Sequence, residues 1–284
     1  MQLIEIGDNQ VVQIGPNHSV DQAIALMEEH GFRHLPVVEH GRILGMLSDR
    51  DLLSAAGMLP NWQRTASSEG PVRIGATTVS QIMSSPARTV AADASLEVAA
   101  ELMLDQGIRA IPLVYKDRIA GIVTETDFLK CYLDDRPIAR RPGWRMQKVT
   151  DHMSRPVVTL LPGDGFRHAV RTMQARGHRH IPIMEDSRLV GIVSDRDMRR
   201  ALLTREIESE DVATQGLKSH NDIAMRDIMT NEVVTINPPA TLAEVADTLV
   251  THKFGALPVT SQGELVGIIT EADLLRIFVA SFKA

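Results

Sequence analysis

Gly121-Ile-Val-Thr124-Glu-Thr-Asp127 is one of four copies of a short pattern that decides the fold of this chain. The pattern is a glycine, two apolar residues, a serine or threonine, two variable residues and an aspartate. The other copies are Gly45-Met-Leu-Ser48-Asp-Arg-Asp51, Gly191-Ile-Val-Ser194-Asp-Arg-Asp197 and Gly267-Ile-Ile-Thr270-Glu-Ala-Asp273. A proline stands nine residues before each glycine, at Pro36, Pro112, Pro182 and Pro258.

The spacing of these prolines gives the organisation of the chain. The steps between them are 76, 70 and 76 residues, so repeats one and three are 146 residues apart, as are repeats two and four. This indicates a pair of repeats that was duplicated as a unit. Repeats this short bury a core by stacking on one another. The predicted repeats are 1–56, 75–132, 146–203 and 222–284, which form modules 1–132 and 146–284 around a linker at 131–147.

The composition limits the class of protein. With 284 residues, the chain is long enough for about two domains. An apolar fraction of 44% and a charged fraction of 23% are typical of globular proteins, and no apolar run is long enough to span a membrane. The net charge of −6 and the 4% of aromatic residues argue against a nucleic-acid-binding surface. The single Cys131 and an N-terminus without the pattern of a secretory signal lead us to expect a cytoplasmic protein.

Repeat two has the clearest secondary-structure pattern, and it predicts an α/β (α+β) unit of order β-α-β-β-α. Ser19 with Gln22 and Thr241 with Glu244 have the spacing of capping boxes at helix starts. Repeat four has Lys253 where the other repeats have a glycine, which predicts a different helix end there. The elements expected in repeat two are a strand at 88–90, a helix after Ser95 that stops at Gly107, strands at 110–115 and 118–123, and a helix that begins at Thr124.

These features together resemble the CBS domain, named after cystathionine β-synthase. Two adjacent copies resemble a Bateman module, and four copies resemble the architecture of the regulatory γ subunit of AMP-activated protein kinase. The resemblance covers nearly all of the chain outside the connectors. It implies that paired repeats pack through their sheets about a pseudo-twofold axis and leave two clefts per pair, which commonly hold adenosine-containing ligands. The two modules are expected to form a pseudo-symmetric disc, within one chain or by dimerisation.

The resemblance also assigns roles to the serine or threonine and the aspartate of each turn. The carboxylate would accept hydrogen bonds from ribose hydroxyls, and the hydroxyl with free helix N–H groups would meet a phosphate. The same spacing is also that of a plain helix cap, so both interpretations stay open. The residues concerned are Ser48, Asp51, Thr124, Asp127, Ser194, Asp197, Thr270 and Asp273.

Basic residues occur near these turns and are unevenly distributed. We expect each odd-numbered repeat to direct two arginines and a histidine at one end of its own cleft, whereas repeat two keeps only Arg109. Arginine suits phosphate oxygens, so the cluster favours AMP, ADP, ATP or a dinucleotide over S-adenosylmethionine, which has no phosphate. The basic residues are Arg33, His34 and Arg50 in repeat one and Arg179, His180 and Arg196 in repeat three.

The sequence predicts neither a metal site nor an enzyme. His178 and His180 alternate along an expected strand and would point to opposite faces, so they would not share an ion. The chain has no P-loop and no nucleotide-binding GxGxxG. Mg²⁺ would enter only with a bound ATP, and no other cofactor is expected.

The resulting hypothesis is a stand-alone regulatory sensor without a membrane anchor. It would bind adenine nucleotides between paired repeats and signal to a separate, unidentified target protein by shifting module geometry. The alternatives are a structural scaffold with empty clefts, an S-adenosylmethionine-binding regulator, and a nucleic-acid-binding regulator that uses basic residues 136–148. For that stretch a solvated linker is the favoured interpretation.

Overall fold

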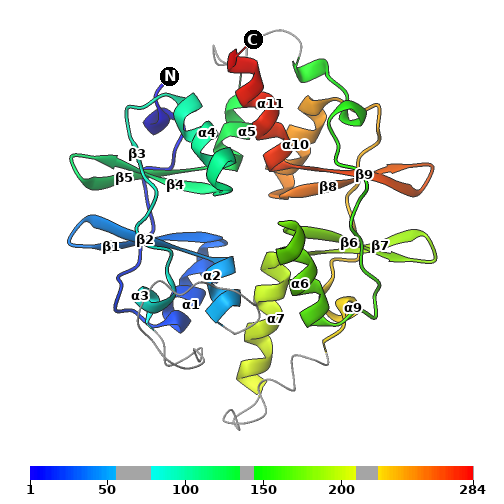
Figure 1. Ribbon diagram of the computed structural model, residues 1–284, viewed down its shortest axis with the longest axis horizontal. Coiled ribbons are helices and arrows are strands. Elements are labelled where there is room, and N and C mark those ends of the chain that lie inside the picture. The colour runs from blue at the N-terminus through cyan, green and yellow to red at the C-terminus, as the bar shows by residue number, and fades with distance from the viewer. Residues whose placement is uncertain (56–77, 135–143, 209–222, 284) are drawn as a thin grey trace.

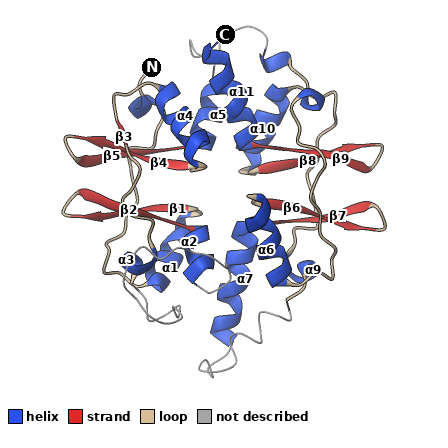
Figure 2. Cartoon of the chain, in the orientation of Figure 1, coloured by secondary structure: helices blue, strands red, loops and turns tan. Residues whose placement is uncertain are grey.

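Four similar units surround a common centre in the computed structural model, which describes residues 1–55, 78–134, 144–208 and 223–283. The hairpins of repeats one and two stack on one side of the flattened molecule, and those of repeats three and four stack on the other (Figure 1). Helices cover the outer faces of the hairpins above and below (Figure 2). The expected pseudo-symmetric disc is therefore confirmed, and a single chain forms it. No helix in the described ranges is long and apolar enough to cross a membrane.

Each repeat contributes a helix, a hairpin and a second helix. Repeat one consists of α1 (Val20–His30), β1 (His34–Glu39), β2 (Arg42–Ser48) and α2 (Asp49–Ala55). Repeat two consists of β3 (Val90–Ala91), α4 (Leu96–Gln106), β4 (Ala110–Tyr115), β5 (Arg118–Thr124) and α5 (Glu125–Leu133). Repeat three consists of α6 (Phe166–Arg176), β6 (His180–Glu185), β7 (Arg188–Ser194) and α7 (Asp195–Glu208). Repeat four consists of α10 (Leu242–His252), β8 (Ala256–Ser261), β9 (Glu264–Thr270) and α11 (Glu271–Lys283).

The first strand of the predicted unit is shorter than the sequence pattern indicates. In repeat two it is the two-residue β3, and in repeat one it is a single bridge between Ile14 and Val37. Ile14 donates to the carbonyl of Pro36 at 3.0 Å and accepts from Val38 at 2.8 Å. Because a proline nitrogen has no hydrogen to donate, the pairing begins at its carbonyl oxygen. The strands predicted at 110–115 and 118–123 are joined, as that spacing requires, by a two-residue turn at Lys116 and Asp117, with φ angles of 49° and 60°.

The glycine of the pattern allows the paired repeat to approach closely. A short segment precedes each repeat: η1 (Leu3–Glu5), α3 (Val79–Ile82), η4 (Val149–Asp151) and α9 (Met225–Ile228). After α3, Ser84 exchanges two backbone hydrogen bonds with Met46, so the segment that leads into repeat two pairs with the hairpin of repeat one. A Cβ at Gly45 would lie 2.8 Å from Sδ of Met83. Met229 covers Gly191 and Met153 covers Gly267 in the same way.

The helix ends agree with the sequence in all but one respect. Both capping boxes form, with Gln22 N–H donating to Ser19 Oγ at 3.2 Å and Glu244 N–H donating to Thr241 Oγ1 at 3.3 Å. The expectation that helix α10 ends differently was wrong. Lys253 adopts φ 57°, close to the 68° of Gly31, and its N–H bonds back into the helix as that of Gly31 does. The fold thus imposes the left-handed conformation on a lysine, which costs backbone strain that glycine avoids.

The ends of the linker pack on the fold at Tyr132 and Trp144, whereas 146–148 are exposed and 135–143 lie outside the described residues, so the expectation of a solvated stretch at 136–148 stays a prediction. Helix α5 continues to Leu133, and Trp144 begins a short 3-10 helix, η3 (Trp144–Met146). The buried Trp144 ring lies 4.2 Å from the ring of Tyr132. The Arg145 guanidinium donates to the carbonyls of Tyr132 and Leu133 at 2.7 and 3.1 Å and so caps α5. Arg140 and Arg141 lie outside the described residues.

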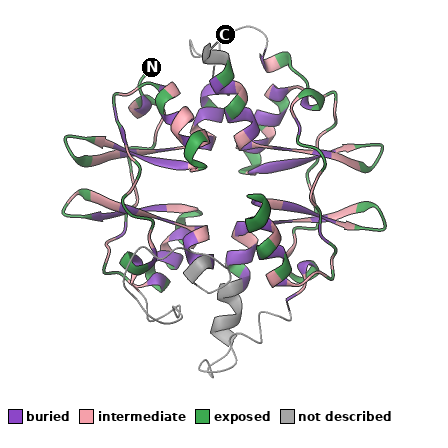
Figure 3. Cartoon of the chain, in the orientation of Figure 1, coloured by how far each residue is buried: buried purple, intermediate pink, exposed green. Residues whose placement is uncertain are grey.

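Two helix contacts join the modules across the disc. Helix α5 packs on α10 and α11, and α2 packs on α7. A continuous apolar core extends through repeats two and four, whereas repeats one and three have distinct cores that Leu53 links, by packing into the core of repeat three. Figure 3 shows the buried residues concentrated where α4, α5, α10 and α11 meet. The centre of the disc lies between these two contacts, where the inner ends of all four hairpins converge.

Candidate functional site

The four Ser/Thr-x-x-Asp turns have the same local geometry. In each, Oδ2 of the aspartate accepts two hydrogen bonds from the serine or threonine three residues earlier. Ser194 donates its N–H to Asp197 at 2.8 Å and its hydroxyl at 2.7 Å. Thr124 makes the same bonds to Asp127 at 2.9 and 2.7 Å. The predicted helix cap therefore forms in every copy, and each carboxylate has one oxygen left.

The partner of that second oxygen, Oδ1, differs between the turns. Ser84 Oγ donates to Asp51 at 3.0 Å, and Lys130 Nζ donates to Asp127 at 3.0 Å. Arg276 donates to Asp273. No described residue bonds to Oδ1 of Asp197. Asp51 is thus enclosed by protein, Asp127 and Asp273 are held by flexible cationic side chains, and Asp197 keeps an open acceptor.

Within the described part of the chain, three of the turns line cavities between paired repeats. The Asp197 cavity has a volume of about 340 Å³, the Asp127 cavity about 330 Å³ and the Asp273 cavity about 230 Å³. The two larger ones reach the lower end of the range for small-molecule sites, about 300–1,000 Å³. In each cavity, one wall is the turn and the other is the segment between helix and hairpin of the paired repeat. That segment is 252–256 in the Asp197 cavity, 30–34 in the Asp127 cavity and 176–180 in the Asp273 cavity.

Several of the basic residues therefore lie beside the turn of the paired repeat rather than the turn of their own repeat. Arg33 and His34 line the Asp127 cavity, with the turn of repeat two. Arg179 and His180 line the Asp273 cavity, with the turn of repeat four. Packing about a pseudo-twofold axis brings the hairpin start of one repeat beside the turn of its partner. The expectation that each odd-numbered repeat supplies its own cleft holds for His180 and Arg196, which line the Asp197 cavity of their own repeat. It was wrong for Arg33, His34 and Arg179, because it grouped residues by repeat rather than by pair.

The remaining predicted arginines lie at the centre of the disc. Arg196 lines both the Asp197 and the Asp127 cavities, and its guanidinium donates to the carbonyl of Gly31 at 2.9 Å. Burial and the charge of Arg109 lower the pKa of Arg50 against the opposing effects of Asp195 and Asp51. Arg50 thus shares the centre with residues from repeats two and three.

An acidic residue that directly follows each serine or threonine was missed as part of the site. These four residues are almost fully buried, and each backbone N–H bonds to a carbonyl at the start of the hairpin of its own repeat at 3.1–3.3 Å. The sequence did carry the signal, because every copy of the turn has an acid at this position. The residues are Asp49, Glu125, Asp195 and Glu271.

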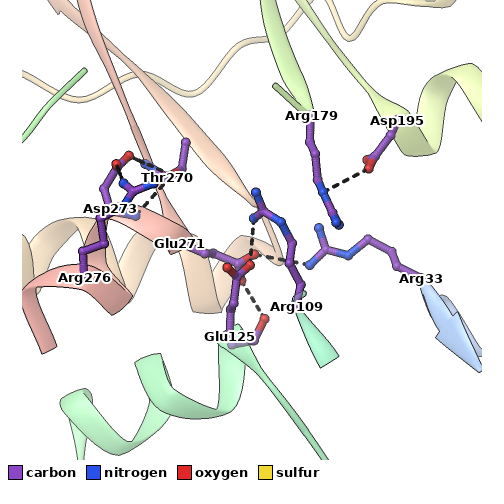
Figure 4. Close-up of polar contacts among 10 residues, drawn as sticks. Arg33, Arg109, Glu125, Arg179, Asp195, Thr270, Glu271, Asp273 and Arg276 are labelled. Atoms are coloured by element: carbon purple, nitrogen blue, oxygen red, sulfur yellow. Dashed lines mark hydrogen bonds and ion pairs between the residues drawn. The ribbon is translucent and has the colours of Figure 1, made fainter. Parts of the chain in front are cut away.

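Three of these acids pair with the arginines that line the cavities (Figure 4). Arg109 and Glu125 of repeat two lie 2.7 Å apart, and Arg179 and Asp195 of repeat three lie 3.8 Å apart. Repeat four has Gly255 in place of an arginine, and Glu271 is paired instead with Arg33 of repeat one, at 3.3 Å. A Cβ at Gly255 would lie 2.5 Å from Cε1 of His180 and 3.3 Å from Arg33. The glycine thus makes room for side chains from the other repeats.

The electrostatics of this centre are those of crowded, buried cations. Burial and the nearby Arg109 lower the pKa of Arg179 to about 9, although Asp195 opposes this. Burial also lowers the pKa of His180 to about 3 and that of His34 well below its usual value, with neighbouring arginines adding to the effect. Both histidines are therefore neutral at physiological pH. Within the described residues, no three His, Cys, Asp or Glu side chains are grouped so as to hold a metal ion.

Comparison with known proteins identifies the family. The profile of the CBS domain matches residues 4–57, 79–134, 149–204 and 225–280. The chain belongs to the CBS domain family. A Methanocaldococcus jannaschii protein, MJ1225, is 26% identical over 98% of this chain and 99% of its own length. Its crystal structure, described as that of a proposed archaeal homologue of γ-AMPK, has a TM-score of 0.81 and 24% identity over 98% of this chain and 100% of that one.

Other relatives agree on the family and the fold. YhcV of Bacillus subtilis, a CBS domain-containing protein, is 36% identical over 42% of this chain and 76% of its own length. The crystal structure of a conserved protein from Pyrococcus horikoshii has a TM-score of 0.61 and 21% identity, over 98% of this chain and 100% of that one. The arrangement of four CBS domains in one disc is therefore one that solved structures share.

Proposed function

We propose that this CBS protein is a regulatory sensor that binds adenosine phosphates in the Asp127, Asp197 and Asp273 cavities. The observation that carries the proposal is the pairing, in one cavity, of an open carboxylate oxygen with partly buried cations. At Asp197, Oδ2 caps its own helix, and Oδ1 has no partner among the described residues. Arg33 and Arg196 line the same cavity. A nucleotide matches this, because its ribose hydroxyls can donate to a carboxylate and its phosphate can accept from arginines.

The Asp273 cavity supports a phosphate-bearing ligand through Arg179. This side chain is 8% exposed, and its Nε has no hydrogen-bond partner. Asp195, at 3.8 Å, compensates its charge incompletely, which agrees with the lowered pKa of the guanidinium. An anion in this cavity would add the charge-assisted bonds that the protein itself does not supply. S-adenosylmethionine would add fewer, because its one carboxylate is offset by an ammonium and a sulfonium and it has no phosphate.

We propose that the fourth turn, that of Asp51 in repeat one, does not bind a nucleotide. Both oxygens of Asp51 are bonded within the protein, Oδ2 to Ser48 and Oδ1 to Ser84. A ribose would therefore have to displace the Ser84 hydroxyl to reach Oδ1. We therefore expect at most three nucleotides per chain, with any Mg²⁺ brought in by a bound ATP.

A structural scaffold without ligands is the second candidate, and the hydrogen bonds of the turns favour it. Every aspartate forms the helix cap that a purely structural role requires. The scaffold predicts that substitution of Asp197 changes stability only. The sensor predicts that it also removes a binding event. In the sensor, ligand binding would shift the populations of two module geometries and so be read by a separate protein.

Isothermal titration of nucleotide-stripped protein with AMP, ADP, ATP and S-adenosylmethionine distinguishes the two. We expect binding of the phosphates and loss of one binding event in Asp197→Ala. The exposed Asp247 of α10 provides the matched control, because Asp247→Ala removes an aspartate from a helix position that lines none of the three cavities. Absence of heat with all four ligands, in protein confirmed to be folded and ligand-free, would establish the scaffold instead.

A further inference from the structure

The three cavities are connected to one another through shared side chains. Arg33 lines both the Asp127 and the Asp197 cavities. Arg109 lines both the Asp127 and the Asp273 cavities, and His180 lines both the Asp197 and the Asp273 cavities. Each pair of cavities thus has a side chain in common. Since burial keeps the pKa of His180 near 3, its link carries no charge at neutral pH, whereas the two arginine links do.

The strongest of these links joins the Asp127 and Asp197 cavities, which lie in different modules. Besides Arg33, they share Arg196 and Lys253. Arg196 comes from repeat three and Lys253 from repeat four, so three repeats supply cations to one boundary. Arg109, in contrast, is bound at 2.7 Å to Glu125 of its own repeat. The boundary between the Asp127 and Asp197 cavities is therefore where two bound phosphates would compete most directly.

Glu271 holds Arg33 at this boundary. The Arg33 guanidinium lies 3.3 Å from Oε2 of Glu271, and Thr126 Oγ1 donates to Oε1 at 2.6 Å (Figure 4). Although burial lowers it, the pKa of Arg33 is raised by Glu271 and Asp195, so the guanidinium stays charged. Glu271 is 1% exposed, begins α11 and lies in the module opposite to Arg33. A carboxylate so placed fixes the arginine between the two cavities rather than inside either one.

We propose that Arg33 couples the Asp127 and Asp197 cavities negatively, with Glu271 as its positioning residue. This rests on the proposed function. A phosphate in one cavity would draw the guanidinium towards it, and the second phosphate would then bind without that arginine. Losing one charge-assisted hydrogen bond to an arginine weakens binding by about tenfold or more. The two modules would thereby sense the occupancy of each other without any change in the overall disc.

The test uses the full chain with the third cavity disabled by Asp273→Ala. In this background, Asp127→Ala and Asp197→Ala each leave a single cavity, and AMP titration gives its intrinsic affinity. We expect the two-cavity protein to bind its second AMP about tenfold more weakly than the weaker single cavity does. Circular dichroism and thermal melting on each variant confirm that it is folded.

Two further variants assign the effect to Arg33 and Glu271. Arg33→Gln should weaken both single cavities and bring the second affinity of the two-cavity protein to within a few-fold of the single-cavity value. Glu271→Gln should instead raise the affinity for the first AMP, because Arg33 no longer has to break an ion pair with a carboxylate to reach the phosphate. Arg42→Gln, at an exposed hairpin position of the same repeat, is the control and should change neither affinity.

The outcomes separate the two proposals. AMP binding to neither single-cavity variant would overturn the proposed function itself. Equal AMP affinities in one- and two-cavity proteins would leave the sensor intact and overturn the coupling. Coupling that persists in Arg33→Gln would show that Arg33 does not carry the coupling and would assign it to Arg196 or Lys253. A Glu271→Gln protein with unchanged first affinity would refute the positioning role.

Discussion

The two helix interfaces that join the modules use equivalent elements and different chemistry. Between repeats two and four, the ring of Phe278 packs edge-on against Phe128 and Tyr132, at 5.5 and 4.5 Å. Between repeats one and three, Arg199 lies 2.8 Å from both Asp49 and Glu28. The first interface is therefore an apolar core shared by two repeats. In the second, an ion-pair network accompanies a smaller apolar contact, in which Leu53 of repeat one joins the core of repeat three.

A single position of the repeat accounts for much of this difference. Two residues after the aspartate of the turn, three repeats have a buried leucine, namely Leu53, Leu129 and Leu275. Repeat three has Arg199, which is only 2% exposed. A buried ion pair contributes less to stability than apolar packing of similar volume, because both charges lose their hydration.

The ionic interface also begins beside the cavities, since Arg196 is one helical turn from Arg199. We infer that the aromatic interface fixes the disc and the ionic one can respond to ligands.

Removal of the Phe278 ring should have the largest effect on stability. The ring is buried and contacts both Phe128 and Tyr132, so Phe278→Ala leaves a cavity in the shared core. We expect a loss of about 3–5 kcal/mol in the free energy of unfolding. Urea denaturation followed by circular dichroism measures it. Val98→Ala, at a position 51% exposed on the neighbouring α4, should change it by less than about 0.5 kcal/mol. A loss below 1 kcal/mol for Phe278→Ala would show that the modules are held together elsewhere.

Arg199→Leu should be the next largest effect and tests the ionic interface. The substitution restores the leucine of the other repeats and leaves Asp49 buried without its partner. We expect destabilisation of about 3 kcal/mol. The double variant Asp49→Asn/Arg199→Leu should regain most of that loss, because it removes the buried Asp49 carboxylate and Glu28 keeps Arg200 as a partner. If the single variant is as stable as the wild type, the ion pair contributes nothing and the comparison between the interfaces fails.

The sequence was sufficient to predict the repeat and its elements. The four prolines and glycines in register fixed the hairpins, and Ser19, Gly107 and Thr124 marked helix boundaries that the structure keeps. These are local signals, because each depends on the backbone within a few residues. Lys253 shows the limit of such reasoning, since tertiary packing imposed a left-handed conformation that the residue does not favour.

The sequence of a single repeat could not predict which residues share a cavity. Arg33 meets Thr124 and Asp127, which are about 90 residues away, only because the paired repeats pack about a pseudo-twofold axis. Its ion pair with Glu271 depends further on how the two modules close the disc. The acids after each Ser/Thr were visible in the sequence. Their burial was not, because a charged residue at a helix start is ordinarily solvated.

The pH dependence of stability should also distinguish the two interfaces. Burial raises the pKa of Asp49 to about 7, with the charge of Asp195 adding to this and Arg199 opposing it. The folded protein therefore holds this proton more tightly than the unfolded chain. The stabilisation from the protonated Asp49 carboxyl is complete below about pH 4. As the pH rises from there towards 7, the free energy of unfolding falls by up to about 1.4 kcal/mol per pH unit.

Urea titrations of the wild type and Asp49→Asn at pH 5, 6, 7 and 8 measure this contribution. Asp49→Asn should gain stability relative to the wild type as the pH rises to about 7, and the difference should then level off. Phe278→Leu, in the aromatic interface, should differ from the wild type by the same amount at every pH. Parallel curves for Asp49→Asn would mean that its carboxyl titrates normally in the folded protein.

The smallest effect concerns the ends of two helices that lie at the two interfaces. Helix α1 ends at Gly31, whose carbonyl accepts a bond from Arg196, and α10 ends at Lys253. Both residues are left-handed, with φ 68° and 57°, and a Cβ at Gly31 would meet no atom within 4 Å. The two substitutions Lys253→Gly and Gly31→Lys therefore measure the energetic cost of a left-handed backbone at a residue that is not glycine. Lys253→Gly should stabilise the protein by about 1 kcal/mol, and Gly31→Lys should destabilise it by about the same amount.

Thermal melting of both variants, together with AMP titration, separates conformation from charge. Because Lys253 lines the Asp127 and Asp197 cavities, Lys253→Gly should weaken AMP binding while it stabilises the fold. A non-glycine residue in a strained conformation is retained more readily where its side chain contributes to binding. If Lys253→Gly raises stability and leaves AMP affinity unchanged, the lysine takes no part in the shared cationic boundary, and that boundary reduces to Arg33 and Arg196.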